Sequence, residues 1–361
     1  MKIAISAAEV SGDLIASKLI QALKTQNPDV TIEGLAGEAM VSAGCKQLWN
    51  QNLVNVMGFS EVLKKLPSLL RLRRNMVEYF STNKPDVFIG VDAPDFNFVL
   101  ERKLKRQKIK TVHFVSPSVW AWRQSRVKKI KESTDLVLCL FPFEVDFYKE
   151  NNQRALFVGH PLAEKLSPRK NYTANKSVLL MPGSRSGEVK RLLPEMLAAA
   201  QLMSAQDPEL TFHLALANAE LQTWAEQQIN TQAVSISIGD AHLRMAQANL
   251  VLVASGTAAL ELALVGVPMV VVYKLSNFSH FIASRLVKSK YISLPNVIAD
   301  KPLVPELIQK QANAENIAKH AMSIINQDNQ VLIQEFHKIH AQLNQNASAE
   351  SARIINEFVC E

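Results

Sequence analysis

Short apolar runs alternate with amphipathic stretches along most of this 361-residue chain. The clearest unit spans residues 250–274, where the apolar run 250–253 leads through small residues into a helical pattern. That helical pattern stops at Gly266 and Pro268, and a second apolar run covers 269–273. Continuous apolar runs are typical of buried parallel strands, and right-handed crossovers place the strand-to-helix loop at the carboxyl end of the sheet. The pattern predicts an α/β protein whose ligands bind at such loops.

The loop in this unit consists of Ser255, Gly256 and Thr257 at a predicted helix start. Unpaired backbone N–H groups and about half a positive charge face outward there, which suits a phosphate. Glu261 lies one turn further on, and its two oxygens suit a ribose diol. The alternative is an ordinary helix cap followed by a Glu that interacts with the helix dipole. The choice depends on the rest of the chain.

A second strand-and-glycine unit begins at residue 177, where an apolar run ends in Gly183, Ser184 and Arg185. The planar fork of an arginine can bind two phosphate oxygens at once, which suits a diphosphate. Alone, the sequence P-G-S-R at 182–185 is a weak turn motif.

Two loops of the first half carry candidate chemistry. Residues 2–8 form an apolar strand that leads into Ser11, Gly12 and Asp13. A later strand at 87–91 ends in D-A-P-D-F-N, which places Asp92 and Asp95 just past its carboxyl end. Both loops lie where open α/β folds bind ligands. Capping of the following helix is the alternative role for these side chains.

The length of the chain predicts two domains rather than one. Residues 163–176 are polar and interrupted, so we place the linker between the domains there. We expect a first Rossmann-like domain at 1–168, a second at 169–340 and a closing helical segment at 341–361.

The composition predicts a cytoplasmic protein. Hydrophobic residues make up 48% and charged residues 20%, and no run approaches the roughly 18 apolar residues of a membrane span. The chain begins directly with a strand, so we expect no signal peptide. Cys45, Cys139 and Cys360 lie far apart, which argues against a disulfide framework or a zinc site.

The net charge of +7 is unevenly placed, because residues 1–131 carry 21 Lys or Arg against 11 Asp or Glu. Within them, residues 60–82 combine leucines with basic residues and contain Pro67. This segment fits either a basic amphipathic helix on an anionic membrane or a core-packed helix with a solvated basic face. Trp120 and Trp122 lie beside further basic residues and fit a nucleic-acid stacking platform, an interfacial anchor or partly buried aromatics.

Eight motifs between residues 3 and about 310 resemble, in order, those of the lipid A disaccharide synthase family. They are E-V-S-G-D at 9–13, D-A-P-D-F-N at 92–97, S-P-S-V-W-A-W at 116–122, G-H-P at 159–161, P-G-S-R at 182–185, S-G-T-A-A-L-E at 255–261, L-P-N at 294–296 and V-P-E-L-I-Q at 304–309. The resemblance implies a GT-B fold, in which two Rossmann-like domains face each other across a cleft. In this fold the closing helices often cross back to the first domain.

The resemblance also implies a reaction in lipid A, and hence lipopolysaccharide, biosynthesis. The family transfers a sugar, with inversion, from UDP-2,3-diacylglucosamine to the 6-hydroxyl of 2,3-diacylglucosamine 1-phosphate, giving a β-1,6 disaccharide phosphate and UDP. Because both substrates are acylated, the protein is expected to lie on the inner face of the anionic inner membrane. The expected membrane-contact residues are Leu66, Leu69, Leu70, Arg71, Leu72, Arg73 and Arg74.

Site roles follow from the matched motifs. Asp95 is the first candidate for the base, followed by Asp92 and Asp13, with Glu9 and His160 behind them; Ser11 and Gly12 form an acceptor loop. The donor UDP is assigned to Gly183, Ser184, Arg185, Ser255, Gly256, Thr257, Glu261 and Asn296. We expect neither a metal nor a cofactor, because no D-x-D motif follows an apolar strand and Arg185 with a helix terminus can balance the diphosphate.

Two other functions remain as alternatives. A UDP-sugar epimerase can share the fold and the donor loop, but it should lack the basic amphipathic segment. A non-enzymatic RNA-binding protein would explain the tryptophans and lysines of the first half, yet it would give Arg185 and Glu261 no role. We therefore expect acylated glucosamine substrates and no nucleic acid, and the sequence leaves a homodimer open.

Overall fold

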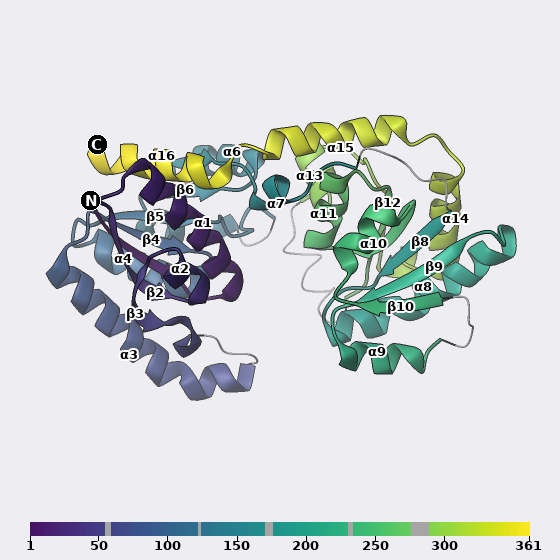
Figure 1. Cartoon of the computed structure of the whole chain (residues 1–361), viewed down its shortest axis with the longest axis horizontal. Helices are drawn as coiled ribbons and strands as arrows, with labels where there is room; N and C mark the ends of the chain where they lie inside the picture. The colour runs from purple at the N-terminus through teal and green to yellow at the C-terminus, as the bar shows by residue number, and fades with distance from the viewer. Residues whose placement is uncertain (55–58, 122–123, 170–175, 230–233, 276–288) are drawn as a thin grey trace. The chain divides into compact units, whose positions relative to one another are not determined.

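The computed structural model of the chain describes residues 1–54, 59–121, 124–169, 176–229, 234–275 and 289–361, and the side chains of 59–65 lie outside that description. It contains two compact units, each built on a parallel sheet (Figure 1). The first unit combines Met1–Glu164 with Leu343–Glu361, and the second is Lys165–Gln342.

The first unit has a seven-stranded sheet in the order β3-β2-β1-β4-β5-β6-β7, and every pair of neighbours is parallel. The strands are β1 (Lys2–Ala7), β2 (Thr31–Ala36), β3 (Lys46–Asn50), β4 (Val87–Val91), β5 (Lys110–Phe114), β6 (Leu136–Cys139) and β7 (Ala155–Phe157). The helices are α1 (Val10–Gln26), α2 (Glu38–Ser42), α3 (Phe59–Asn83), α4 (Pro94–Lys105), α5 (Val127–Ser133), α6 (Pro142–Glu150), α7 (Pro161–Lys165) and α16 (Ala347–Cys360).

Alternate residues of these strands enter two different cores. Ile3 and Ile5 of β1 pack on the face that α1 and α16 cover, whereas Ala4 and Phe88 face the core that includes residues of α3 and α4. Burial on both faces explains why the strands read as continuous apolar runs. The last helix, α16, belongs to this unit because its Ile355 is fully buried in the same core as α1.

The second unit has a six-stranded sheet in the order β10-β9-β8-β11-β12-β13, again parallel throughout. The strands are β8 (Ser177–Met181), β9 (Thr211–Leu216), β10 (Val234–Ile238), β11 (Leu250–Ala254), β12 (Met269–Tyr273) and β13 (Glu306–Ile308). The helices are α8 (Ser186–Gln206), α9 (Ala219–Glu226), α10 (Ala241–Gln247), α11 (Thr257–Val265), α13 (Leu294–Ala299), α14 (Ala314–Ile325) and α15 (Gln330–Leu343). The strand-loop-helix-strand prediction for residues 250–274 is confirmed.

The strand orders define where ligands bind. The chain direction across the sheet reverses between β1 and β4 in the first unit and between β8 and β11 in the second. At such a switch point the two outgoing loops diverge and leave a crevice beyond the carboxyl ends of the strands. The loops that follow β1, β4, β8 and β11 are the ones that carry the sequence motifs. Among the described residues, none of the helices is long and apolar enough to cross a membrane.

Candidate active site

The loop after β4 is held in an unusual backbone conformation. Asp92 and Ala93 both have positive φ angles, +52° and +42°, which non-glycine residues adopt rarely. Such strain persists where surrounding contacts over-determine it, and it clusters at functional sites. The buried Asn97 supplies those contacts, since its amide nitrogen donates to the carbonyl oxygens of Asp92 at 2.8 Å and Val91 at 3.2 Å. The Ser6 hydroxyl in turn donates to the Asn97 side chain at 2.8 Å.

The start of α1 packs closely against this loop. Gly12 lies where any β-carbon would come within 3.3 Å of the Val91 carbonyl oxygen. The Ser11 hydroxyl lies 3.4 Å from an Asp92 carboxylate oxygen. Burial, together with the charge of Asp92, raises the pKa of Glu9 above its usual value. The predicted acceptor loop and Asp92 are thus brought together at the first switch point.

The Asp13 carboxylate is engaged in hydrogen bonds within the first unit. It is 5% exposed, and its carboxylate accepts hydrogen bonds from the backbone N–H groups of Gly37 at 2.8 Å, Ala39 at 2.9 Å and Met40 at 3.3 Å. These groups form the amino terminus of α2, where backbone donors lack helical partners. Asp13 therefore caps α2 and fixes it against α1, which leaves its oxygens engaged.

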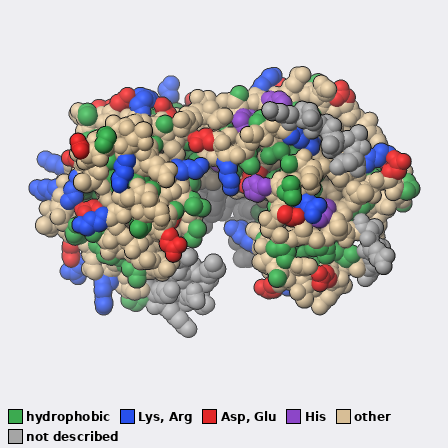
Figure 2. Space-filling model, in the orientation of Figure 1, with side chains coloured by type: hydrophobic (Ala, Val, Ile, Leu, Met, Phe, Trp, Pro, Cys, Tyr) green, Lys and Arg blue, Asp and Glu red, His purple; other side chains and the backbone are tan. Residues whose placement is uncertain are grey.

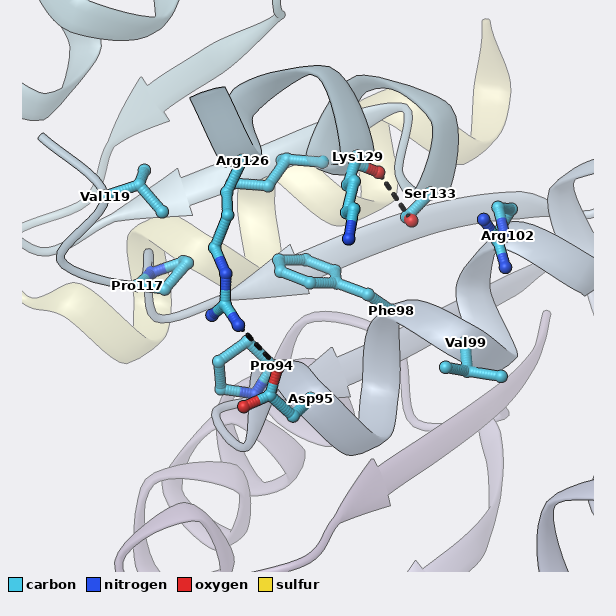
Figure 3. Close-up of a pocket in the computed structure, with 11 residues that line it drawn as sticks. Pro94, Asp95, Phe98, Val99, Arg102, Pro117, Val119, Arg126, Lys129 and Ser133 are labelled. Carbon is cyan, nitrogen blue, oxygen red and sulfur yellow. Dashed lines mark hydrogen bonds and ion pairs between the residues drawn. The ribbon is translucent and has the colours of Figure 1, made fainter. Parts of the chain in front are cut away.

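Asp95 lies in the first turn of α4 and keeps its carboxylate accessible. Its side chain is 86% exposed, and the Arg126 guanidinium lies 3.4 Å from it (Figure 3). Arg73 of α3 donates to the Asp95 backbone oxygen at 2.6 Å and stacks over the Phe96 ring at 4.8 Å. The backbone of Asp95 is thus fixed, while its carboxylate is exposed to solvent beside Arg126.

Asp95 stands at the edge of a cavity between α4, the loop that follows β5 and α5 (Figure 3). The lining is apolar in the middle and basic around it. It consists of Pro94, Asp95, Phe98, Val99, Arg102, Pro117, Val119, Arg126, Lys129, Ile130 and Ser133. In the sequence, the basic residues stand out as a charge excess and as neighbours of the tryptophans. Phe98 and Val99 do not stand out, because helical periodicity alone assigns such residues to a core.

The loop that follows β5 is anchored by a buried carboxyl group. Glu144 of α6 is 2% exposed and accepts a hydrogen bond from the Phe141 backbone at 3.1 Å. Burial raises the pKa of Glu144 to about 8, although hydrogen bonds that include one from Ser116 oppose the shift. The Trp120 ring packs edge-on against Phe143 at 4.7 Å, so it is a partly buried aromatic of this loop. Trp122 lies outside the described residues.

His160 is poorly suited to act as a base. Burial lowers the pKa of His160 to about 4, and its Nδ1 accepts a hydrogen bond from the Leu162 backbone at 3.1 Å. The ring packs near Phe141 at a centroid distance of 5.2 Å.

One half of helix α3 packs into the core of the first unit, and the described side chains of the other half are mostly exposed. Leu72 is 8% exposed and packs with Met76 and Phe80, so it cannot contact a membrane and leaves the predicted set. Arg73 is half-buried and turned toward Asp95 and Phe96. Of the predicted contacts that remain, Leu66 and Leu70 are 42% and 53% exposed, Leu69 is half-buried, and Arg71 and Arg74 are exposed. Figure 2 shows further Lys and Arg side chains over the visible face of the first unit.

The second switch point gathers most of the predicted donor residues around one pocket. Gly183 and Ser184 from the loop after β8 line it together with Ser255, Gly256 and Thr257 from the loop after β11. Two helices, α8 and α11, begin at these loops, and Arg185 is the residue immediately before α8. Backbone N–H groups at helix starts favour an anion, so the pocket suits a diphosphate.

Glu188 also lines this pocket and is not among the predicted donor residues. It lies so close to Gly183 that a β-carbon there would collide with its carboxylate, which explains the glycine with φ of +112°. Burial raises the pKa of Glu188, while the Arg185 charge opposes that shift. The i to i+3 spacing of Arg185 and Glu188 was the available signal.

Three predicted donor residues, Arg185, Glu261 and Asn296, are not among the residues that line the pocket. Burial raises the pKa of Glu261, with His242 and Lys165 opposing the shift. Asn296 is 1% exposed, and its amide nitrogen donates to the Val304 carbonyl and to Glu306, both at 2.9 Å. Both amide hydrogens are therefore used inside the unit.

Asn296 acts on the donor loop through its neighbours. Glu306 accepts hydrogen bonds from the backbone of Ile292 at 3.0 Å and of Ser293 at 2.9 Å. The Ser255 hydroxyl donates to the Ile292 carbonyl at 3.2 Å. The L-P-N motif thus supports the loop after β11, and we assign Asn296 a positioning role.

Comparison with known proteins identifies close sequence relatives. The family model for lipid-A-disaccharide synthetase matches residues 3–358. The chain is 42% identical to the lipid-A-disaccharide synthase of Hahella chejuensis, over 99% of this chain and 94% of that protein. It is 40% identical to the lipid-A-disaccharide synthase of Methylobacillus flagellatus, over 99% of each.

Solved structures share the fold at much lower identity. A UDP-GlcNAc 2-epimerase from Neisseria meningitidis, bound to UDP-GlcNAc, has a TM-score of 0.63 and 13% identity over 100% of both chains. MurG from Acinetobacter baumannii has a TM-score of 0.60 and 14% identity over 99% of both. These likenesses concern the fold alone. They confirm the GT-B fold class, with two Rossmann-like parallel-sheet units.

Proposed function

This chain belongs to the lipid-A-disaccharide synthase family, and on that premise we propose how its own residues carry out the family's reaction. The enzyme transfers 2,3-diacylglucosamine from its UDP derivative to the 6-hydroxyl of 2,3-diacylglucosamine 1-phosphate. The products are UDP and a β-1,6-linked tetraacyl disaccharide phosphate. Family membership does not favour the epimerase or the RNA-binding alternative.

The observation that carries the assignment of the base is the contrast between two carboxylates of the first unit. Asp13 has its oxygens occupied by three backbone N–H groups, whereas Asp95 is 86% exposed at the edge of a cavity. A base must reach the proton that it removes, so accessible geometry comes first. We assign the base to Asp95 and keep Asp92, beside Glu9 and Ser11, as the second candidate.

In the proposed step, Asp95 takes the proton of the acceptor 6-hydroxyl as that oxygen bonds to C1 of the donor sugar. The bond from C1 to the UDP oxygen breaks, its electron pair leaves with UDP, and the configuration at C1 inverts. The amide groups around Ser255, Gly256 and Thr257 and the guanidinium of Arg185 stabilise the departing diphosphate. Glu261 remains the proposed ribose contact, at the second turn of α11.

We propose that this step needs neither a divalent metal nor a cofactor. Arg185 immediately precedes α8, and its charge acts on Glu188 of the pocket lining. In this proposal, Arg185 and the starts of α8 and α11 supply the positive charge that a cation supplies in other transferases. Turnover in the presence of excess EDTA supports this assignment, and recovery of lost turnover by magnesium contradicts it.

We also propose that the enzyme binds peripherally to the cytoplasmic face of the inner membrane through the exposed half of α3. Leu66, Leu70 and Arg74 recur every four residues, so they share one helix face, with Arg71 beside it. Exposed leucines next to cations suit the boundary between acyl chains and anionic headgroups.

Acceptor-dependent release of UDP tests the proposed function. In mixed micelles, the purified enzyme should release UDP from UDP-2,3-diacylglucosamine only when 2,3-diacylglucosamine 1-phosphate is present. Equal release without the acceptor would show that water or another molecule accepts the sugar.

A further inference from the structure

The cavity beside Asp95 has an apolar floor, and these apolar residues take no part in the proposed proton transfer or sugar transfer. Phe98 and Val99 of α4 are half-buried, and their remaining surface faces the cavity together with Pro117. Val119 and Ile130 close it from the opposite side and are 4% and 0% exposed. A hydrophobic cavity that remains open in the folded chain favours a hydrocarbon ligand over a sugar.

Positive charge surrounds this apolar floor. Arg126 and Lys129 extend into the cavity from the α5 side and Arg102 lies further along α4, as Figure 3 shows. Asp95 is the one carboxylate in the lining, so three cations face a single anion. Among the residues that the structure describes, Arg102 has only a distant, exposed partner, Glu132 at 3.9 Å, and Lys129 forms no ion pair. The cavity therefore suits a ligand that is both apolar and anionic.

We propose that this cavity binds one acyl chain of the acceptor lipid, with Lys129 and Arg126 holding the phosphate of the same molecule. The proposal rests on the proposed function, because that reaction supplies an acceptor with two acyl chains and a phosphate. A soluble sugar phosphate would not need the apolar floor, and an uncharged lipid would not need the cations. The occupant also places its sugar beside Asp95, the proposed base.

The ion pair between Arg126 and Asp95 means that binding of the acceptor also affects the proposed base. Arg126 lies 3.4 Å from the Asp95 carboxylate. A phosphate bound to Arg126 competes for that guanidinium, since a phosphate presents more charge and more acceptor oxygens than a carboxylate. Binding of the acceptor thereby leaves the Asp95 oxygens available for the 6-hydroxyl.

Filling the cavity tests the acyl subsite. Val99→Trp places an indole where the chain would lie, and Val41→Trp, at a 43% exposed position on α2, is the matched control. Acceptor and donor analogues with short and long acyl chains are varied separately. Val99→Trp should raise KM for the long-chain acceptor about tenfold, with little change for the shortest acceptor and for either donor. Val41→Trp should behave as wild type.

Removing one cation tests the phosphate contact. Lys129→Ala should raise KM for the phosphorylated acceptor about tenfold and leave KM for the dephosphorylated acceptor unchanged. Lys128→Ala removes the neighbouring exposed cation, which does not line this cavity, and serves as the control. An equal effect of the two variants would show that only the general charge of α5 matters, and it would overturn the phosphate contact.

Equilibrium binding of the acceptor in detergent micelles, measured beside turnover, separates this proposal from the proposed function. Weaker acceptor binding by Val99→Trp than by wild type supports the acyl subsite. This holds even if neither protein shows turnover, in which case only the proposed reaction is contradicted. If Val99→Trp keeps the wild-type affinity and chain-length profile, the subsite is overturned. A changed profile for the donor instead of the acceptor also overturns it.

Discussion

Asp92, Asp95 and Asp13 lie beyond the carboxyl ends of β1 and β4, yet their carboxylate oxygens have different neighbours. Asp13 is enclosed by backbone donors, Asp92 lies near Ser11 and Glu9, and Asp95 faces a cavity and Arg126. All three lie just past the ends of strands in the sequence, and their order as candidates there rested on the matched motifs, not on their surroundings. The ranking depends on which backbone N–H groups a folded loop turns toward each carboxylate.

Asp95→Asn should lower kcat by about 10²–10⁴-fold, because an amide cannot remove the proton of the acceptor hydroxyl. Its melting temperature should remain near that of wild type, since the Asp95 side chain is 86% exposed. Initial rates of UDP release and a thermal melt measure both effects. Activity within a few-fold of wild type would move the base to Asp92.

Asp13→Ala should lower the free energy of unfolding of the first unit by about 1–3 kcal/mol, because three backbone donors of the α2 region lose their buried acceptor. Denaturant titration of the full chain measures this loss. Turnover per folded molecule should change little. If Asp13→Asn folded normally but abolished turnover, the structural role given to Asp13 would be wrong.

Glu144 should make the stability of the first unit depend on pH. Its pKa is about 8 when folded and near 4.5 when unfolded, so between these values the folded chain binds more protons than the unfolded chain. The free energy of unfolding therefore falls as pH rises through this window. Below pH 4.5 both states are protonated and the contribution is constant. Denaturant midpoints of wild type and Glu144→Gln, compared at pH 5 and pH 8, should show a smaller decline for the variant.

At the scale of the elements, α3 shows what sequence patterning can and cannot determine. The mixture of leucines and arginines predicts an amphipathic helix and leaves its partner open. In the structure, Leu72, Met76 and Phe80 recur every four residues and enter the core, whereas Leu66 and Leu70 do not. Leucines and cations occur in both parts of the helix, and no local pattern marks where burial begins.

Leu66→Glu combined with Leu70→Glu should weaken binding to anionic phospholipid vesicles about tenfold or more, because two apolar side chains lose their place in the interface. Vesicle sedimentation at fixed ionic strength measures this. Leu202→Glu, at a 40% exposed position of α8 in the second unit, is the matched control. Equal binding of the double variant and the control would argue against a membrane role for α3.

The parallel sheets could be predicted from the sequence, because apolar residues repeat differently in buried strands and in helices. The switch-point loops could be predicted because glycines and small polar residues follow the strands. Gly183, Ser184 and Ser255–Thr257 line one pocket as a result. The internal hydrogen bonds of Asn296 could not be foreseen, because a buried amide and a ligand-binding amide look alike in one sequence. Phe98, Val99 and Arg126 were not linked, because only the fold brings α4 and the start of α5 to one cavity.

At the scale of the whole molecule, the end of the chain stabilises its beginning. The helix α16 packs on α1, and Arg154 forms an ion pair with Glu361. Ile355→Ala should lower the free energy of unfolding of the first unit by about 2–5 kcal/mol, as expected for a fully buried aliphatic residue. Backbone amides in the central strand β11 of the second unit, such as that of Leu252, should keep their native hydrogen-exchange protection. A variant with wild-type stability would contradict the packing of α16.

The identity of the product tests the central claim most directly. Purified enzyme is incubated with UDP-2,3-diacylglucosamine and 2,3-diacylglucosamine 1-phosphate in mixed micelles with EDTA, and the product is analysed by mass spectrometry and proton NMR. The account predicts a tetraacyl disaccharide monophosphate with a β-configured new linkage, formed together with UDP. Release of UDP without this disaccharide, or an α linkage, would contradict it.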